Sequence, residues 1–141
     1  MKRSILIVES NRAMQFLLTM ILKKRYHVRS AQNSRQAMQL FASGYETDLA
    51  VLDIANFEAE NFELMEHIST SSIFKNMPTI VLCESRNEEL KKACLEMGAS
   101  DFLTKQFDPV YLFEKTNQLL AENLPDVLPK RRRIFNNMNI F

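Results

Sequence analysis

Residues 48–53 of the chain are Asp48-Leu49-Ala50-Val51-Leu52-Asp53, an apolar, β-prone run that ends on a carboxylate. Such a run is typical of a buried strand. In open α/β sheets the carboxyl ends of the strands form the rim where ligands bind, so this strand is expected to deliver Asp53 to that rim. A second run, Phe102-Leu103-Thr104-Lys105, ends on a lysine. An aspartate and a lysine at one rim indicate a phosphate site.

Short apolar runs alternate with amphipathic segments along the rest of the chain. The predicted strands are Ile5 to Val8, about His27 to Ala31, Leu49 to Leu52, Thr79 to Cys83 and Asp101 to Leu103, and the predicted helices cover about residues 12–24, 34–43, 60–70, 86–97 and 109–122. This alternation predicts an α/β fold with a five-stranded parallel sheet, doubly wound by helices on both faces. Polar residues alternating in the second strand indicate a sheet edge. Gly44 and Gly98 follow predicted helices and are expected to adopt left-handed caps.

The bulk composition describes one ordinary globular domain. The chain has 141 residues, of which 46% are hydrophobic and 25% charged. We expect one domain over residues 1–124 and a tail over residues 125–141. The apolar runs are far shorter than the roughly 20 residues that span a bilayer, and the start of the chain lacks a signal-peptide pattern. The two cysteines are not at metal-ligand spacing. These features predict a cytoplasmic protein with reduced thiols.

The tail is basic, since it holds four consecutive cations, Lys130 to Arg133, and one acid, Asp126. Four cations can bind phosphates, anionic lipid or an acidic partner, although a solvated extension is the ordinary state of a terminus. The alternative is a docking helix, because the apolar residues Ile134, Phe135, Met138 and Phe141 fall on one helical face. The remaining body is mildly acidic, so no DNA-binding domain is expected.

Four segments in this order and spacing resemble the receiver domain of two-component response regulators, which has a CheY-like, flavodoxin-like fold. They are Ile5-Leu6-Ile7-Val8-Glu9, the run 48–53, Pro78-Thr79-Ile80-Val81-Leu82 and Gly98-Ala99-Ser100-Asp101-Phe102-Leu103-Thr104-Lys105. The resemblance covers about residues 2–122. It implies strand order 2-1-3-4-5 and a signalling domain that is not an enzyme with a small-molecule substrate.

The resemblance also implies roles for single residues. Asp53 would accept a phosphoryl group from a histidine kinase or phosphotransfer protein, and Lys105 would neutralise its charge. Cys83 stands at the switch-hydroxyl position, and Phe102 is the aromatic residue of the fifth strand. A magnesium ion would be held by Glu9, Ser10, Asp53 and the carbonyl of Ala55. A downstream protein would bind the surface formed by the fourth helix, fifth strand and fifth helix, and a second copy of the chain is a further candidate partner.

Three of these positions, Glu9, Ser10 and Cys83, depart from the family pattern. Glu9-Ser10 replaces a pair of acids, and because Mg²⁺ depends on carboxylate ligands, its site is expected to be weak or absent. Glu9 is either a weak metal ligand or a strand-end acid paired with Lys105. Glu84 either supplies a replacement carboxylate or repels the phosphate. Cys83 is a poor hydrogen-bond donor, and a small buried hydrophobe is its simplest interpretation.

The sequence therefore predicts a stand-alone, atypical receiver domain that acts through protein–protein contacts. The alternative is a pseudo-receiver that binds its partner without phosphorylation. A flavin- or nucleotide-binding enzyme of the same fold is a third hypothesis. It needs a phosphate-cradling loop after the first strand, but Glu9-Ser10-Asn11-Arg12 contains no glycine and begins with an acid.

Overall fold

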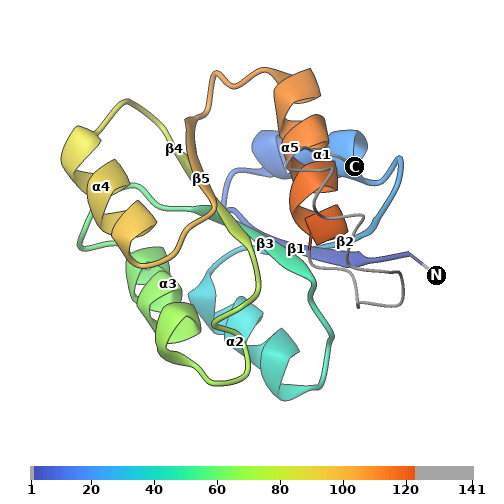
Figure 1. The fold of residues 1–141 in the computed structure, drawn as a ribbon, viewed down its shortest axis with the longest axis horizontal. Helices are drawn as coiled ribbons and strands as arrows, with labels where there is room; N and C mark the ends of the chain where they lie inside the picture. The colour runs from blue at the N-terminus through green and yellow to red at the C-terminus, as the bar shows by residue number, and fades with distance from the viewer. Residues whose placement is uncertain (1, 123–141) are drawn as a thin grey trace, which may run out of the picture.

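The structure, a computed structural model, describes residues 2–122, and the predictions for the tail lie outside them. Five strands alternate with five helices in this part of the chain (Figure 1). The elements are β1 (Ser4–Val8), α1 (Arg12–Leu22), β2 (His27–Ala31), α2 (Ser34–Ala42), β3 (Leu49–Asp53), α3 (Glu60–Thr70), β4 (Thr79–Cys83), α4 (Glu88–Glu96), β5 (Asp101–Thr104) and α5 (Pro109–Glu122). The predicted order of elements is confirmed.

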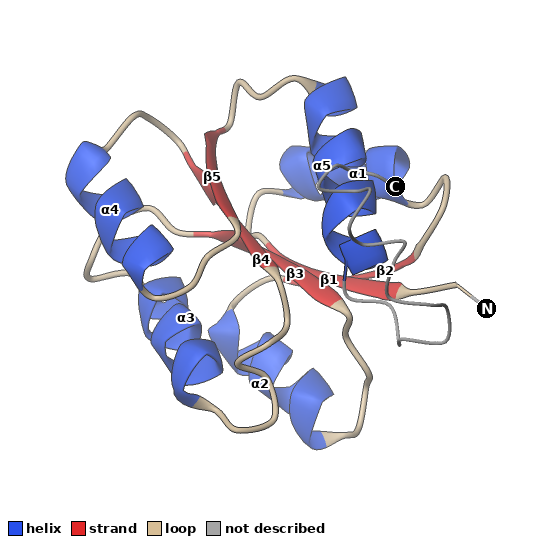
Figure 2. Ribbon diagram, in the orientation of Figure 1, coloured by secondary structure: helices blue, strands red, loops and turns tan. Residues whose placement is uncertain are grey.

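All neighbouring strands are parallel, in the order β2-β1-β3-β4-β5. Helices α1 and α5 cover one face of the sheet, and α2, α3 and α4 cover the other (Figure 2). This is the predicted doubly wound α/β fold. The strand β2 forms one edge, as expected from its exposed, polar residues. Since the strands are parallel, all five carboxyl ends lie at one rim of the sheet.

The core consists of two apolar layers, one on each side of the sheet. Successive side chains of a strand point to opposite faces, so β1 sends Leu6 and Val8 toward α2–α4, and Ile5 and Ile7 toward α1 and α5. All four are fully buried. Central strands buried on both faces must be apolar throughout, which is why they read as continuous apolar runs in the sequence.

Asparagine side chains fix where three of the helices begin. Asn11, Asn33 and Asn87 each accept a hydrogen bond from a backbone N–H in the first turn of the following helix. The cap at Asn87 places the start of α4 two residues later than predicted. At the other end of α2 and α4, Gly44 has φ 89° and Gly98 has φ 107°. This left-handed conformation confirms both glycine predictions.

Candidate functional site

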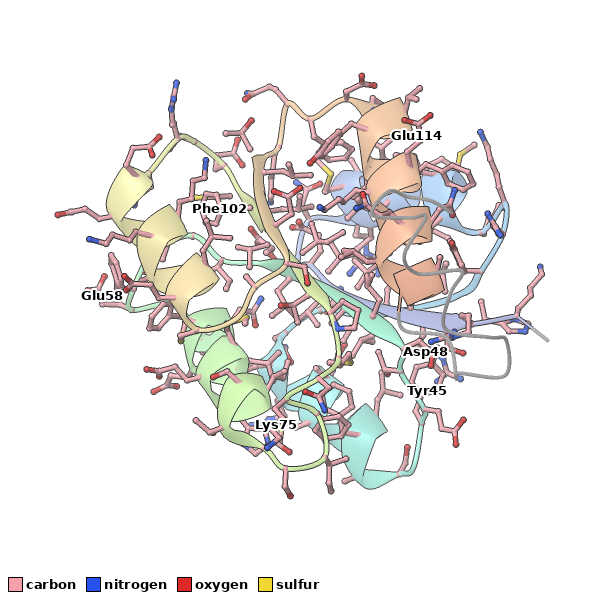
Figure 3. The ribbon with its side chains drawn as sticks, in the orientation of Figure 1. Tyr45, Asp48, Glu58, Lys75, Phe102 and Glu114 are labelled. Atoms are coloured by element: carbon pink, nitrogen blue, oxygen red, sulfur yellow. The ribbon has the colours of Figure 1, made fainter. Side chains whose placement is uncertain are left out.

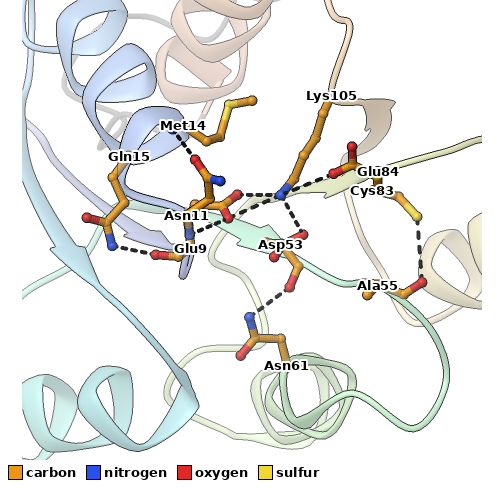
Figure 4. A network of polar contacts seen from close by, with 10 residues as sticks. All are labelled: Glu9, Asn11, Met14, Gln15, Asp53, Ala55, Asn61, Cys83, Glu84 and Lys105. Atoms are coloured by element: carbon orange, nitrogen blue, oxygen red, sulfur yellow. Dashed lines mark hydrogen bonds and ion pairs between the residues drawn. The ribbon is translucent and has the colours of Figure 1, made fainter.

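Four side chains come together at the carboxyl-end rim of the sheet (Figure 4). Glu9, Glu84 and Lys105 each follow directly after a strand, and Asp53 is the last residue of β3. The parallel register pairs Val8 with Leu52 across β1 and β3, so the side chains that follow are delivered to neighbouring positions. The structure thus places Asp53 and Lys105 at the same rim.

The ammonium group of Lys105 is the centre of this cluster. Its Nζ lies 3.0 Å from Glu9 Oε1 and 3.2 Å from Asp53 Oδ1, and it donates a hydrogen bond of 3.1 Å to Glu9 Oε2. The side chain of Glu84 is 79% exposed, and its Oε1 is 4.0 Å away. A pair with so exposed a carboxylate contributes little. Lys105 therefore joins Glu9 and Asp53, with Glu84 as a solvated neighbour.

Glu9 is 1% exposed, and several groups hold it in place. Its backbone N–H donates to the carbonyl of Ala31 at 2.9 Å, and the N–H of Asn11 donates to its Oε2 at 3.0 Å. The amide of Gln15 donates to its backbone carbonyl. Among the described residues, Oε1 has no hydrogen-bond donor of good geometry, so the nearby ammonium compensates its charge. Of the two roles predicted for Glu9, the structure shows the pairing with Lys105.

The two carboxylates keep Lys105 charged. Burial of the ammonium lowers the pKa of Lys105, because a low-dielectric environment disfavours the cation. The hydrogen bond to Glu9 and the charge of Asp53 act in the opposite direction and outweigh burial, so its pKa lies above the ordinary value. Lys105 is therefore a fixed positive charge at neutral pH.

The backbone at Asp53 is anchored by a residue whose role the sequence did not reveal. Asn61, in the first turn of α3, donates its Nδ2 to the carbonyl oxygen of Asp53 at 2.7 Å. The side chain of Asp53 is 19% exposed, so solvent reaches the carboxylate from the open side of the rim. An asparagine early in the helix that follows β3 was the available signal, but many other roles fit the same residue type.

The remaining predicted site residues are divided between the rim and the core. Ser10 is exposed beside Glu9. Cys83 is 2% exposed and belongs to the core layer under α2–α4, and its Sγ lies 3.9 Å from the carbonyl of Ala55. Phe102 is 7% exposed in the same layer, on the strand that faces α4 (Figure 3). The structure thus places Cys83 where a small buried hydrophobe belongs.

The rim is poorly suited to the magnesium ion that the resemblance implies. Mg²⁺ requires near-octahedral oxygen ligation with carboxylates. Within residues 2–122, no group of three His, Cys, Asp or Glu side chains is arranged to hold a metal. The carboxylate of Glu9 is buried against an ammonium group, Ser10 has no charge, and the Ala55 carbonyl faces a thiol. Of the predicted ligands, Asp53 is the one with a carboxylate open to solvent, so the donor set is poorer than a pair of acids would make it.

The sequence of the chain is similar to those of known proteins. The family model of the response regulator receiver domain matches residues 5–117. The transcriptional regulatory protein GltR of Pseudomonas aeruginosa is 32% identical over 119 residues, which cover 84% of this chain and 49% of GltR. The two-component response regulator ORR7 of Oryza sativa subsp. japonica is 23% identical over 117 residues, 82% of this chain and 56% of ORR7. The chain spans about half the length of these curated relatives.

Solved structures show the same fold. The signal receiver domain of a signal transduction histidine kinase from Syntrophus aciditrophicus has a TM-score of 0.75 at 26% identity, covering 90% of this chain and 98% of that one. The Mn²⁺-bound form of response regulator Rcp1 has a TM-score of 0.69 at 23% identity, covering 89% and 97%. Within residues 2–122, no helix has the length and apolar character needed to cross a membrane.

The family model and the relatives together show that the chain belongs to the response regulator receiver domain family of two-component signalling.

Proposed function

We propose that Asp53 is the phosphoacceptor of this receiver domain and that a histidine kinase or phosphotransfer protein is the donor. One observation carries the proposal: the Lys105 Nζ lies 3.2 Å from Asp53 Oδ1 at the open rim of the sheet. A carboxylate oxygen of Asp53 attacks the phosphorus atom, forming an acyl phosphate while the bond from phosphorus to the donor nitrogen breaks. Lys105 stabilises the charge on the transferring oxygens, which is the main requirement of phosphoryl transfer.

Lys105 does not act on Asp53 alone, because Glu9 shares the same ammonium. This sharing holds the lysine at the rim before a phosphoryl group arrives. It also lowers the positive charge left for the phosphate. The exposed carboxylate of Glu84, 4.0 Å from the ammonium, adds repulsion. We therefore expect slower phosphorylation than a site with an unshared lysine would give.

Receiver domains typically bind Mg²⁺ at their acidic pocket. In this chain we propose that the metal site is weak or absent, because Ser10 supplies no charge and Glu9 is buried against Lys105. The family's signalling role is in general not enzymatic, and we propose no small-molecule substrate. The two buried free cysteines are compatible with a reducing compartment, which supports a cytoplasmic location.

The proposed output surface is the one formed by α4, β5 and α5. Three large apolar side chains are exposed there: Leu95 is 40%, Val110 62% and Tyr111 43% exposed. The hydroxyl of Tyr111 donates to Asp101 Oδ2 at 2.5 Å, which ties the start of α5 to β5. These side chains would supply apolar contact area to a protein partner. A downstream protein is the proposed partner, and a second copy of the chain is the alternative.

The test is a titration of the whole chain with beryllofluoride and Mg²⁺, followed by amide shifts. We expect shifts at the ends of β3, β4 and β5 that disappear in an Asp53→Asn variant. Glu84→Gln is the matched control, since it also removes one carboxylate near the lysine but leaves Asp53 intact. Shifts that persist in Asp53→Asn, or no shift in the wild-type chain together with full cellular activity of Asp53→Ala, would contradict the proposal.

A second candidate function is a pseudo-receiver that binds its partner without phosphorylation. The buried pair of Glu9 and Lys105 favours it, because it satisfies the lysine without metal or phosphate. Magnesium titration separates the two candidates. A pseudo-receiver shows no binding in the millimolar range, whereas a working phosphoacceptor site responds to Mg²⁺.

A further inference from the structure

A second charged region lies at the opposite end of the sheet, where β1 and β2 begin. A cavity of about 440 Å³ opens there between the α1–β2 connection and the last turns of α5. We call it the amino-end hollow. Its walls include Lys2, Arg3, Arg25, Tyr26, Asn117 and Leu120. In Figure 1 the last turn of α5 lies beside the start of β1. Asp53, by contrast, is at the end of β3, on the carboxyl-end rim.

The charges around the hollow are positive and incompletely neutralised. Arg3 forms an ion pair with Asp48, 3.5 Å from Nε to Oδ1. No carboxylate among residues 2–122 forms an ion pair with Lys2 or Arg25. The α1–β2 connection that borders the hollow contains three consecutive cations, Lys23, Lys24 and Arg25. Lys2 and Arg25, whose charges no carboxylate of residues 2–122 neutralises, are therefore available to an anion.

The hollow contains a hydrogen-bonded polar pair, Tyr26 and Asn117. Tyr26 is 5% exposed, and its hydroxyl donates to Asn117 Oδ1. This bond leaves the Nδ2 group of Asn117 as the donor that remains for a ligand. Burial raises the pKa of Tyr26, while the charges of Arg25 and Arg3 act against that rise.

We propose that the amino-end hollow binds a phosphate-bearing anion through Arg25, Lys2 and Asn117. A guanidinium group matches two phosphate oxygens in a bidentate geometry, and a lysine acts as a mobile point charge. Several cations around one cavity fit an anion with more than one negative charge, which favours a phosphate ester over a monocarboxylate. The site is independent of Asp53, because the two lie at opposite ends of the strands.

The test is a titration of the full-length chain with pyrophosphate at low salt, followed by amide shifts. We expect shifts at Arg25, Tyr26, Asn117 and Ala121, which line the hollow. An Arg25→Glu variant should bind about tenfold more weakly, because a bidentate partner becomes repulsive. Lys92→Glu is the matched control, since it makes the same charge change on α4, on the other face of the sheet. It should leave the affinity nearly unchanged.

Three results would overturn the proposal. The first is the absence of shifts in the hollow. The second is an equal weakening by Arg25→Glu and Lys92→Glu, which indicates attraction to the overall charge. A third variant excludes the basic tail: replacing Lys130, Arg131, Arg132 and Arg133 by Gln must leave the shifts in place, and their loss would also overturn the proposal.

Vesicles distinguish the source of the phosphate group. Binding to phosphatidylserine vesicles that pyrophosphate competes away, and that Arg25→Glu weakens, identifies a lipid headgroup. Pyrophosphate binding without vesicle binding identifies a soluble phosphate ester. Both results uphold the site. Vesicle binding that pyrophosphate leaves unchanged places the lipid contact outside the hollow, and pyrophosphate binding in the hollow then identifies a soluble phosphate ester as its ligand.

Discussion

The two ends of the sheet use the same types of charged residue in opposite ways. At the carboxyl end, Lys105 is 12% exposed and lies 3.0 Å from Glu9 Oε1 and 3.2 Å from Asp53 Oδ1. At the amino end, Lys2 and Arg25 are exposed around an open cavity. Buried charges depend on their partners, whereas exposed charges are stabilised by water. The carboxyl end should therefore dominate stability, whereas the cations at the amino end should contribute little to it and be available to a ligand.

The largest expected effect comes from removing the cation at the carboxyl end. A Lys105→Met variant leaves the carboxylate of Glu9 buried without its counter-charge. Breaking a buried pair in this way typically costs about 3 kcal/mol. Urea unfolding of the wild-type and variant chains measures the loss of unfolding free energy. The exposed Lys92→Met is the matched control and should change stability by less than about 0.5 kcal/mol.

The double variant Glu9→Leu and Lys105→Met tests whether the unpaired carboxylate of Glu9 causes this loss of stability. Replacing both partners by apolar residues removes the unpaired charge, so it should recover part of the stability lost in Lys105→Met. If the double variant loses as much unfolding free energy as the two single variants lose together, Glu9 and Lys105 are not coupled. The stability of the carboxyl end then does not depend on their pairing.

An intermediate effect is expected at alkaline pH. The pKa of Lys105 in the folded chain is raised above its ordinary value of 10.5. The folded state thus holds this proton more tightly than the unfolded state. The resulting stabilisation is fully present below pH 10.5 and is lost as the pH rises through the folded pKa. The difference in unfolding free energy between wild type and Lys105→Met should shrink over that range.

This difference isolates the lysine from the tyrosines. The pKa values of Tyr26 and Tyr111 are also raised, by burial and by the hydrogen bond to Asp101 respectively. Both tyrosines are present in the wild type and in the variant, so their titration cancels in the difference. A difference that stays constant with pH would show that Glu9 and Asp53 do not hold the proton on Lys105.

The smallest effect on stability is expected at the amino end. Arg25→Ala should change the unfolding free energy by less than about 0.5 kcal/mol, because an exposed cation is well solvated and has no carboxylate partner within residues 2–122. Urea unfolding measures it. A loss of unfolding free energy comparable with that of Lys105→Met would show that cations at the two ends of the sheet contribute equally to stability.

The position of the site followed from local sequence. Asp53 and Lys105 each end a strand-like run, and parallel strands bring such ends to one rim, so their proximity was predictable. The sequence did not distinguish the two possible roles of Glu9, metal ligand and partner of Lys105, because an acid at the end of a strand suits both. Asn61 was also beyond sequence reasoning as an anchor of Asp53, since its bond depends on the path of the loop between β3 and α3.

Local patterns of hydrophobicity and capping were thus sufficient for the α/β fold, the order of its elements and the rim that holds Asp53. These patterns involve residues only a few positions apart. They repeat with the period of a strand or a helix, so they can be recognised in the sequence. The pairing of Glu9 with Lys105 joins residues 96 positions apart, and the amino-end hollow joins the first residues of the chain to the last turns of α5. Such partners depend on how the elements pack in three dimensions, which no short-range pattern encodes.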